Sequence, residues 1–318
     1  MGVPLVGAAI GWTSLANAWP GFSSGPFSAL LLGSAAAVVV GRVLATVHRT
    51  LVPSAIVVGA VLLAVATPDL LSGASLGGPL GYANANGALF VQAAMASLML
   101  AAASRTTAVR ALGLLSAGAF GIVPFAAKSV TSGTLLVLLP AIALLTRALA
   151  GARTAVAVCA ALFVVTVVAT SALGVTYAAG DRSSLAERVV DASIDERRVA
   201  LWHEAITLMV QHPASGVGIG GFQVLSPTAR ADRDARWAHN SFLQQGAETG
   251  LIGLVLLTLL FLWGFASLGL VQNPDVMDVL GAVALAALGI HACVDYILHF
   301  PAIPITAAAL VGAARSPR

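Results

Sequence analysis

The chain contains 318 residues, of which 58% are hydrophobic and 9% are charged, and its mean hydropathy is +0.94. A soluble domain carries about 25% charged residues, so the composition argues against a soluble enzyme and for a membrane protein. The net charge of +3 is too small and too scattered to favour nucleic-acid binding, and the two cysteines do not match the spacing of a disulfide framework or a zinc site.

Apolar segments follow one another along most of the chain. A transmembrane helix needs about 20 mostly apolar residues. Ten segments approach or meet that length: 3–19, 27–47, 52–71, 84–103, 108–127, 133–150, 154–176, 249–271, 277–296 and 299–314. Pro301 and Pro304 are expected to shorten the last segment or to make it re-entrant. The sequence therefore predicts an all-α fold, a single membrane domain over residues 1–318 with about ten transmembrane helices.

Arginines mark alternate loops between most of these segments. The loop near 272–278 is the exception, since it holds Asp275 and Asp278 but no basic residue. The loops 20–26 and 72–83 carry no basic residue. The alternate loops and the C-terminus carry Arg42, Arg49, Arg105, Arg110, Arg147, Arg153, Arg315 and Arg318. Cytoplasmic loops are enriched in arginine and lysine, so we expect both termini to be cytoplasmic in a plasma or inner membrane. The long insert 178–248 is then extracytoplasmic.

The insert 178–248 holds most of the acidic residues of the chain and opens with a predicted helix. Ser193 and Glu196 have the spacing of a capping box, and the helix should run from about 194 to 211, before Pro213. One apolar stripe of this helix consists of Val199, Trp202, Ile206 and Met209. We expect the stripe to pack on the membrane domain.

Arg197 and Arg198 lie in the first turn of that helix. Two interpretations stay open from the spacing alone. The pair is either a solvated helix start or an anion clamp, since guanidinium groups bind phosphate through a planar, permanently charged fork.

Two further patterns in the insert resemble ligand motifs. The glycines between Gly216 and Gly221 resemble part of a dinucleotide-binding loop, but no strand precedes them, so a tight turn or a close approach of the backbone to a neighbour is favoured over nucleotide binding. Asp232, Arg233 and Asp234 have the form of a metal-binding motif of sugar transferases, but three-residue matches are common by chance and arginines crowd this one. We predict neither a metal nor a cofactor.

Histidines and an aspartate near the outer ends of two segments are candidate functional groups. His239 and Asn240 open the helical stretch that leads into a span, where His239 acts either as a proton-transfer group or as a structural hydrogen-bonding residue. His291 and Asp295 are four residues apart and could touch on one helix. Asp295 either faces the same cavity as His239 or ties two helices together.

Several motifs between residues 78 and 301 together resemble the O-antigen ligase and O-antigen polymerase superfamily. The most specific runs from His239-Asn240 to Glu248, Gly250 and Gly253. The others are Arg197/Arg198 with Trp202, Pro213, Gly216-Val217-Gly218 and Phe222, the segment Gly81-Tyr82-Ala83-Asn84-Ala85-Asn86, and the segment from His291 to Pro301.

The resemblance implies a multi-span glycosyltransferase without a metal or a nucleotide sugar. Members of that superfamily transfer a glycan from a polyprenyl-diphosphate carrier to a hydroxyl of a lipid, a glycan or a protein. Carried over to this chain, His239 is the catalytic residue, and Arg197, Arg198 and Lys128 are candidates to bind the diphosphate. The supporting residues would be Trp202, Asn240, Glu248, Tyr82, Asn84 and Asp295. Membrane lipid is a further expected partner, and nucleic acid is not.

One segment departs from the superfamily. Many members carry Ser-Arg-Gly at the outer start of a middle span, where this chain reads Lys128-Ser129-Val130-Thr131-Ser132-Gly133. Lys128 would supply a point charge without the bidentate fork of an arginine. Two other functions stay open: transport of a small solute or anion, and a non-catalytic role in envelope polysaccharide assembly.

Overall fold

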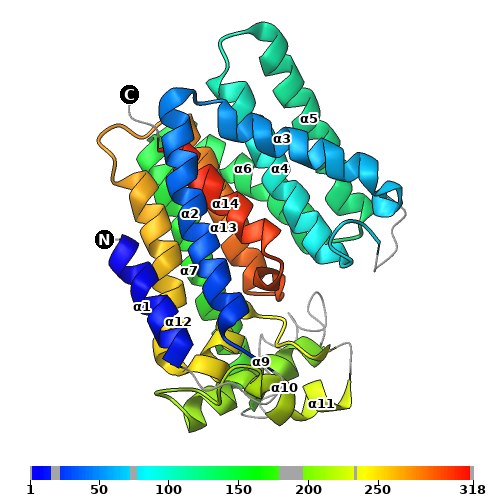
Figure 1. Ribbon diagram of the computed structural model, residues 1–318, viewed down its shortest axis with the longest axis vertical. Coiled ribbons are helices and arrows are strands. Elements are labelled where there is room, and N and C mark those ends of the chain that lie inside the picture. The colour runs from blue at the N-terminus through cyan, green and yellow to red at the C-terminus, as the bar shows by residue number, and fades with distance from the viewer. Residues whose placement is uncertain (1, 16–21, 72–76, 179–195, 233–234, 316–318) are drawn as a thin grey trace. The chain divides into compact units, whose positions relative to one another are not determined.

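The computed structural model describes residues 2–15, 22–71, 77–178, 196–232 and 235–315, and helices account for most of them (Figure 1). No β-strand occurs in these ranges. The elements are α1 (Gly2–Leu15), α2 (Gly25–Val47), α3 (Leu51–Ala66), η1 (Pro68–Leu71), α4 (Ala83–Ala103), α5 (Thr107–Ala126), α6 (Val130–Ala150), α7 (Ala152–Ala178), α9 (Glu196–Gln211), α10 (Gly221–Leu225), α11 (Pro227–Ala231), α12 (Ser241–Gly269), α13 (Val276–Ala292), η3 (Ile297–His299) and α14 (Ala302–Ala314). The predicted all-α class is confirmed.

Each of the ten predicted apolar segments coincides with a helix. Among the residues that the structure describes, six helices are long and apolar enough to cross a membrane, namely α2, α4, α5, α6, α7 and α12. The apolar helices α1, α3, α13 and α14 are shorter, and α14 starts only after Pro301, as its prolines predict. The count of ten spans stays a prediction.

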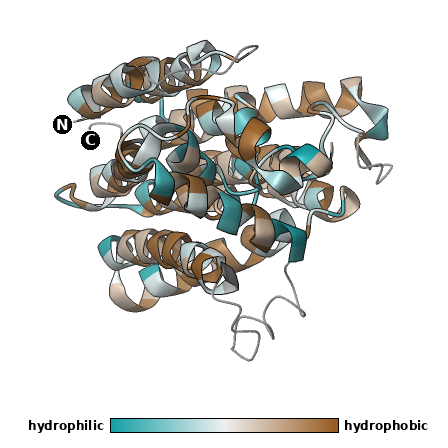
Figure 2. Cartoon of the chain, turned by 90° about the horizontal axis from the view of Figure 1, so that it is seen from below, coloured by the Kyte–Doolittle hydropathy of each residue, from teal (hydrophilic) through white to brown (hydrophobic). Residues whose placement is uncertain are grey.

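Large apolar side chains cover the outside of these helices. Val65, Leu115 and Leu149 are 76%, 73% and 79% exposed, and hydrophobic residues dominate most of the helices (Figure 2). Soluble proteins rarely expose contiguous apolar surface of this extent, whereas in a bilayer such surface faces lipid. The chain is therefore a membrane protein.

The chain forms two compact units, each assembled from three stretches. The first unit contains Met1–Leu32, Phe163–Phe261 and Ala292–Tyr296. The second unit contains Gly33–Leu162, Leu262–His291 and Ile297–Arg318. The short stretch Ala292–Tyr296 thus belongs to the first unit, although the residues on both sides of it belong to the second.

Helix α4 forms the centre of the second unit. It contacts α3, α5, α6 and α14, and nearly all of its residues from Ala85 to Leu100 are buried. Two of its buried polar side chains form hydrogen bonds within the unit: the Gln92 Nε2 atom donates to the Ala284 carbonyl at 3.1 Å, and the Ser97 hydroxyl donates to the Ala93 carbonyl at 2.9 Å.

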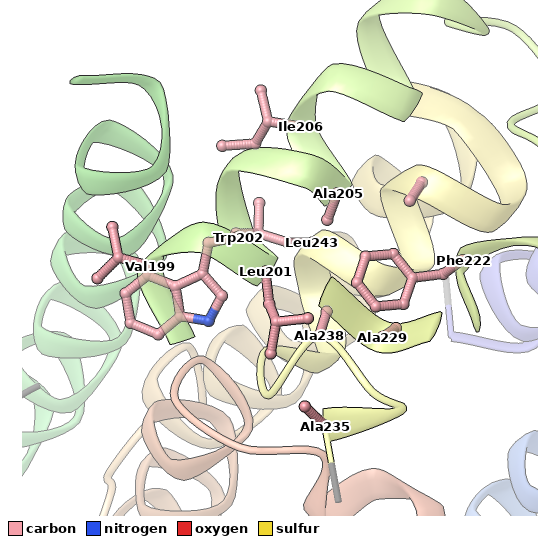
Figure 3. Packing of buried hydrophobic residues seen from close by; sticks show 11 residues of the cluster. Val199, Leu201, Trp202, Ala205, Ile206, Phe222, Ala229, Ala235, Ala238 and Leu243 are labelled. Carbon is pink, nitrogen blue, oxygen red and sulfur yellow. The ribbon is translucent and has the colours of Figure 1, made fainter. Parts of the chain in front are cut away.

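The first unit contains a hydrophobic core that is formed mainly by its shorter helices. It brings α9, α10 and α11 together with the beginning of α12 (Figures 1 and 3). The helix predicted at 194–211 is confirmed as α9, and its stripe residues Val199, Trp202 and Ile206 are buried. The predicted capping box depends on Ser193, which lies outside the described residues.

Glu204 fastens α11 to α9 within this core. Its carboxylate accepts hydrogen bonds from the Ser226 hydroxyl and, at 2.7 Å, from the Thr228 hydroxyl. The Ser226 Oγ atom in turn accepts from the Ala229 backbone N–H at 3.0 Å and so caps α11. A helix of five residues is not stable alone, so these contacts are what hold α11 in place.

Candidate active site

His239 and Asn240 lie immediately before α12, and the side chain of Asn240 caps this helix. The Asn240 Oδ1 atom accepts hydrogen bonds from the backbone N–H groups of Phe242 at 3.1 Å and Leu243 at 3.0 Å. Such a cap satisfies N–H groups that lack a partner within the helix. The Asn240 Nδ2 atom also donates to Thr170 Oγ1 of α7 at 3.2 Å, so the backbone beside His239 is held by two helices.

His239 and Lys128 share an uncommon backbone conformation. Among the residues that the structure describes, they are the only non-glycine residues with a positive φ, at 48° and 58°. A residue with a Cβ atom adopts this left-handed region at a cost of order 1–3 kcal/mol, and such strain clusters at functional sites. At Lys128 the conformation closes the end of α5, because the Ser129 N–H donates to the Pro124 carbonyl at 2.9 Å and the Lys128 N–H donates to the Phe125 carbonyl at 3.0 Å. The conformation of His239 is an observation in favour of a functional role.

The carboxylate of Asp295 is completely buried and contacts the imidazole of His239. The His239 Nδ1 atom lies 3.1 Å from Asp295 Oδ1, and the Tyr296 backbone N–H donates to the same oxygen at 2.8 Å. The Ser241 hydroxyl donates to the Asp295 carbonyl at 3.1 Å. A buried carboxylate is costly unless it is paired and hydrogen-bonded, so these contacts stabilise its position.

The predicted span 277–296 extends too far at its C-terminal end. Helix α13 ends at Ala292, so His291 is helical and Asp295 lies in the connection that follows. The spacing of four residues therefore does not place the two side chains on one helical face. The His291 Nδ1 atom lies 3.5 Å from the Ser132 hydroxyl in the second unit.

The two adjacent arginines of α9 have different partners. Arg198 donates through Nη1 to the Val294 carbonyl at 2.6 Å, and its Nη2 atom lies 3.8 Å from Asp295 Oδ2. Arg197 forms an ion pair with Asp232 at 2.6 Å, at the end of α11. Successive side chains on an α-helix point about 100° apart, which explains the divergence. Arg198 therefore shares its carboxylate with His239, whereas Arg197 does not.

Trp202 lies in the core of the first unit and forms a hydrogen bond with the backbone of His239. The indole is completely buried beside Val199 and Leu201 (Figure 3). Its Nε1 atom donates to the His239 carbonyl at 3.3 Å. Because a buried indole N–H needs an acceptor, this contact links the apolar stripe of α9 to the position of His239.

Helix α12 is interrupted at Gly250, which has φ 74° and ψ −176°. The glycine-rich segment that follows Pro213 satisfies the backbone groups that this break releases. The hydrogen bonds run from Leu251 N–H to Pro213 O at 2.8 Å, from Val217 N–H to Ala247 O at 2.8 Å and from Gly218 N–H to Glu248 O at 2.9 Å. A Cβ atom on Gly216 would lie 2.4 Å from the Glu248 carbonyl carbon, so only glycine fits there. The glycines thus form a close backbone approach, as the sequence predicts.

Glu248 connects the break in α12 to the residue before His239. Its carboxylate accepts hydrogen bonds from the backbone N–H groups of Gly220 and Phe222 and, at 3.3 Å, from Gln244 Nε2. Gln244 in turn accepts from the Ala238 backbone N–H at 3.2 Å. Glu248 is therefore a buried bracing residue of the loop that carries His239.

Three of the predicted site residues belong to the second unit. Tyr82 lies at the start of α4, where its hydroxyl accepts from Asn84 Nδ2 at 3.0 Å and its ring stacks on Phe300 with centroids 5.9 Å apart. Lys128 is exposed in the turn between α5 and α6. The remaining predicted residues are all in the first unit: Arg197, Arg198, Trp202, His239, Asn240, Glu248 and Asp295.

Two aromatic residues beside His239 were missed in the sequence. The Tyr296 ring meets the His239 ring edge to face with centroids 5.0 Å apart, and the Trp237 ring stacks on Tyr296 at 6.1 Å. The sequence feature that could have revealed them is Trp237, a tryptophan in a polar stretch two residues before the predicted catalytic histidine. Charge and hydrogen-bonding motifs alone could not show it.

No group of three or more His, Cys, Asp or Glu side chains suited to a metal ion occurs in the described part of the chain. Asp232 of the possible metal motif pairs with Arg197, and its neighbours Arg233 and Asp234 lie outside the described residues.

A family model described as O-antigen ligase matches residues 82–258, more than half of the chain. The chain belongs to the O-antigen ligase family. No curated protein matches it. The family match includes Tyr82, Lys128, both arginines of α9 and His239 and ends before Asp295. In this O-antigen ligase family member, the carboxylate partner of the histidine thus comes from beyond the matched region. Family membership supports a glycosyltransferase type of enzyme.

Proposed function

We propose that the protein transfers a glycan from a polyprenyl-diphosphate carrier to a hydroxyl acceptor. The observation that carries the proposal is the contact of His239 and Arg198 with one buried carboxylate, Asp295. This contact supports the proposal because the reaction needs a group that accepts a proton and a fixed positive charge, and an imidazole and a guanidinium can supply them. The alternation of arginines between loops supports an extracytoplasmic site in the plasma or inner membrane, with both termini cytoplasmic.

In this proposal His239 is the general base. With Nδ1–H donated to Asp295, the imidazole presents Nε2 as its proton acceptor. Nε2 takes the proton of the acceptor hydroxyl while the acceptor oxygen bonds to the anomeric carbon. The bond from that carbon to the phosphate oxygen breaks, and the polyprenyl diphosphate leaves with the electron pair. Direct attack of this kind inverts the anomeric configuration.

The negative charge that develops on the leaving diphosphate needs fixed cations. Arg198 is the first candidate because Asp295 and Val294 hold its guanidinium beside His239. Arg197 and Lys128 are further candidates, and Arg197 would have to exchange Asp232 for phosphate. Preorganised charges are usually the largest single contribution to such catalysis, so the proposed reaction needs no metal ion.

The proposal is tested with the purified full chain, a polyprenyl-diphosphate oligosaccharide and candidate acceptors. Product sizing distinguishes two outcomes: a ladder indicates a polymerase, and a single adduct indicates a ligase. His239→Ala should insert normally and lose transfer, whereas His212→Ala, at an exposed histidine after α9, should keep it. Full transfer by His239→Ala would remove the histidine from the mechanism.

Transport is the second candidate, and the interrupted helix α12 is the observation in its favour. Transporters bind solutes at breaks in membrane helices. Here the segment after Pro213 occupies the break with backbone hydrogen bonds, which favours a structural role. Solute uptake by vesicles that contain only this protein would support transport. A non-catalytic assembly role, suggested by Lys128 in place of an arginine, would be excluded by transfer with the purified chain alone.

A further inference from the structure

The rings of Trp237, Tyr296 and His239 form a row of contacts, and His239 at its end contacts the buried carboxylate of Asp295. Trp237 and Tyr296 stack with an interplanar angle of 28°, and Tyr296 meets His239 at 83°. The rings come from two connections, the one that precedes α12 and the one that follows α13. Trp237 precedes His239 by two residues, and Tyr296 directly follows Asp295. Any group bound on these rings is therefore next to the proposed general base.

Trp237 and Tyr296 are less buried than the aromatic side chains that fill the core of the first unit. Both are partly exposed. Phe163, Trp202 and Phe222 of the same unit are completely buried, and they fill the core. A tryptophan and a tyrosine kept at the surface next to a functional site suit ligand contact, since each offers a large rigid face at low entropic cost.

The chemistry around the two rings favours a sugar over a lipid tail. Arg198 and Asp295 lie in the same cluster, and the exposed Arg236 adjoins Trp237 in the chain. A pyranose has C–H groups of positive polarity on one face, which match the negative face of an aromatic ring, and hydroxyls at its edge, which match charged neighbours. An isoprenoid chain has only the first of these properties.

We infer that Trp237 and Tyr296 form a stacking subsite for a pyranose ring directly beside His239. This inference rests on the proposed glycan transfer and specifies where its sugar is held. The ring comes either from the glycan of the donor or from a glycan acceptor, and both sources have the same recognition chemistry. Trp237 contributes the larger face, and Tyr296 positions it by stacking.

The kinetic test compares Trp237→Ala and Trp237→Phe with the wild-type full chain. KM is measured for the donor and for a glycan acceptor, each at saturating concentration of the other. Loss of one stacking face should raise KM for one of them by roughly tenfold with little change in kcat. The substrate affected identifies the source of the ring. Phenylalanine should restore most of the affinity, because it keeps an aromatic face.

Trp263 of α12 provides the matched control, since it is a partly exposed tryptophan of the second unit. Trp263→Ala should leave both KM values unchanged. If Trp237→Ala lowers kcat and leaves both KM values unchanged, the residue only positions the loop and the inference is overturned. Unchanged kinetics in that variant would overturn it as well.

A binding test separates this inference from the proposed reaction. The free oligosaccharide is titrated into the wild type and into Trp237→Phe while tryptophan fluorescence is recorded. A saturable change that is lost in the variant supports the subsite even if no transfer is ever detected. Sugar-free polyprenyl diphosphate serves as the second probe. If it produces the same Trp237-dependent change as the oligosaccharide, the rings bind lipid and the inference fails.

Discussion

The two histidines His239 and His291 are both enclosed by protein, yet their surroundings differ in kind. His239 is 13% exposed and contacts the carboxylate of Asp295, with Arg198 on the same carboxylate. His291 is 1% exposed at the end of α13 and contacts the hydroxyl of Ser132. The small cavity beside it is lined mainly by apolar side chains: Ala88, Val91, Leu135, Ala287 and Leu288, with Gln92.

This difference shows which histidine can handle a proton. A carboxylate stabilises the imidazolium that forms when a histidine accepts a proton, and it fixes the tautomer beforehand. A neutral hydroxyl in an apolar setting provides neither charge compensation nor access to solvent. We therefore expect His239 to serve catalysis and His291 to serve packing.

Exchanging each histidine for glutamine is the strongest test of this contrast. His239→Gln should lower transfer by about 10²–10⁴-fold, the usual contribution of a general base. His291→Gln should keep most of the transfer activity and lower the melting temperature of the purified protein. Transfer assays and thermal unfolding of both variants provide the measurement. Equal loss of transfer in the two variants would end the distinction.

The second test removes the charge of Asp295 and keeps its shape. Asp295→Asn should lower kcat by about 10²–10⁴-fold, because the amide no longer stabilises a protonated His239 or holds its tautomer. The measurement is kcat at saturating donor and acceptor. Asp232→Asn is the matched control, since Asp232 pairs with Arg197 rather than with the histidine. A normal kcat in Asp295→Asn would reduce the carboxylate to a structural role.

Exchange of single arginines sharpens the comparison within the first unit. Arg198→Lys should raise KM for the donor by roughly tenfold, because lysine lacks the planar fork that binds phosphate. Arg197→Lys should have a smaller effect, since Arg197 is 48% exposed and paired with Asp232. If Arg197→Lys raises KM for the donor more than Arg198→Lys does, Arg197 rather than Arg198 binds the diphosphate.

A fourth test concerns the frame that holds His239. Gly250→Ala should destabilise the protein by about 1–3 kcal/mol or more, because φ is 74° and the new Cβ atom would lie 2.4 Å from the Ala214 carbonyl oxygen. Gly118→Ala in α5, where a Cβ atom meets nothing within 4 Å, should be neutral or slightly stabilising. Thermal unfolding compares them, and equal melting temperatures would contradict the strained break.

The smallest expected effect concerns a half-exposed counterpart of the Arg198–Asp295 pair. Arg49 and Asp275 form an ion pair at 3.0 Å, with side chains 34% and 28% exposed. Burial raises the pKa of Asp275, but the charge and hydrogen bond of Arg49, together with hydrogen bonds from the Met277 and Asp278 backbone N–H groups, lower that pKa below its usual value. The pair therefore stabilises the protein above the ordinary aspartate pKa, and this contribution fades as pH falls through the lowered value.

Solvent screening limits this stabilisation to less than about 1 kcal/mol. We expect Asp275→Asn to flatten the acid limb of the stability curve and to leave transfer unchanged. Melting temperatures between neutral and acidic pH provide the measurement. A wild-type curve that Asp275→Asn reproduces at every pH would show that the pair contributes nothing.

The sequence predicted the helices well and the connections poorly. Apolar runs of about 20 residues and the stripe on α9 depend on local periodicity, so their positions were close to those observed. The end of α13 depends on contacts between residues that are distant in the sequence. The same is true of the hydrogen bonds between the segment after Pro213 and the break in α12. Gly216 and Gly250 indicated positions where the backbone turns tightly or lies close to a neighbour. The sequence could not show that the two segments lie close to each other.

The residues of the candidate site were predictable in part. Residue type singled out His239 and the two arginines but left a structural role open for each, and only the resemblance to the superfamily assigned them functional roles. The pairing of Asp295 with His239, and the separate partners of Arg197 and Arg198, required the tertiary structure. Trp237 and Tyr296 carry no charge, and neither was singled out from the sequence, although Tyr296 lies within the motif segment from His291 to Pro301; only their position beside the imidazole made them notable.

The stretch Ala292–Tyr296 has a consequence for shortened forms of the gene product. It supplies the acceptor for Arg198, the carboxylate for His239 and the ring for Trp237, although it lies near the end of the chain. A truncated product that stopped with the family-matched stretch would retain its histidine and both arginines, but it would lose the carboxylate and the ring. We therefore expect a stop codon between residues 259 and 291 to abolish transfer, although it spares every residue of the matched stretch.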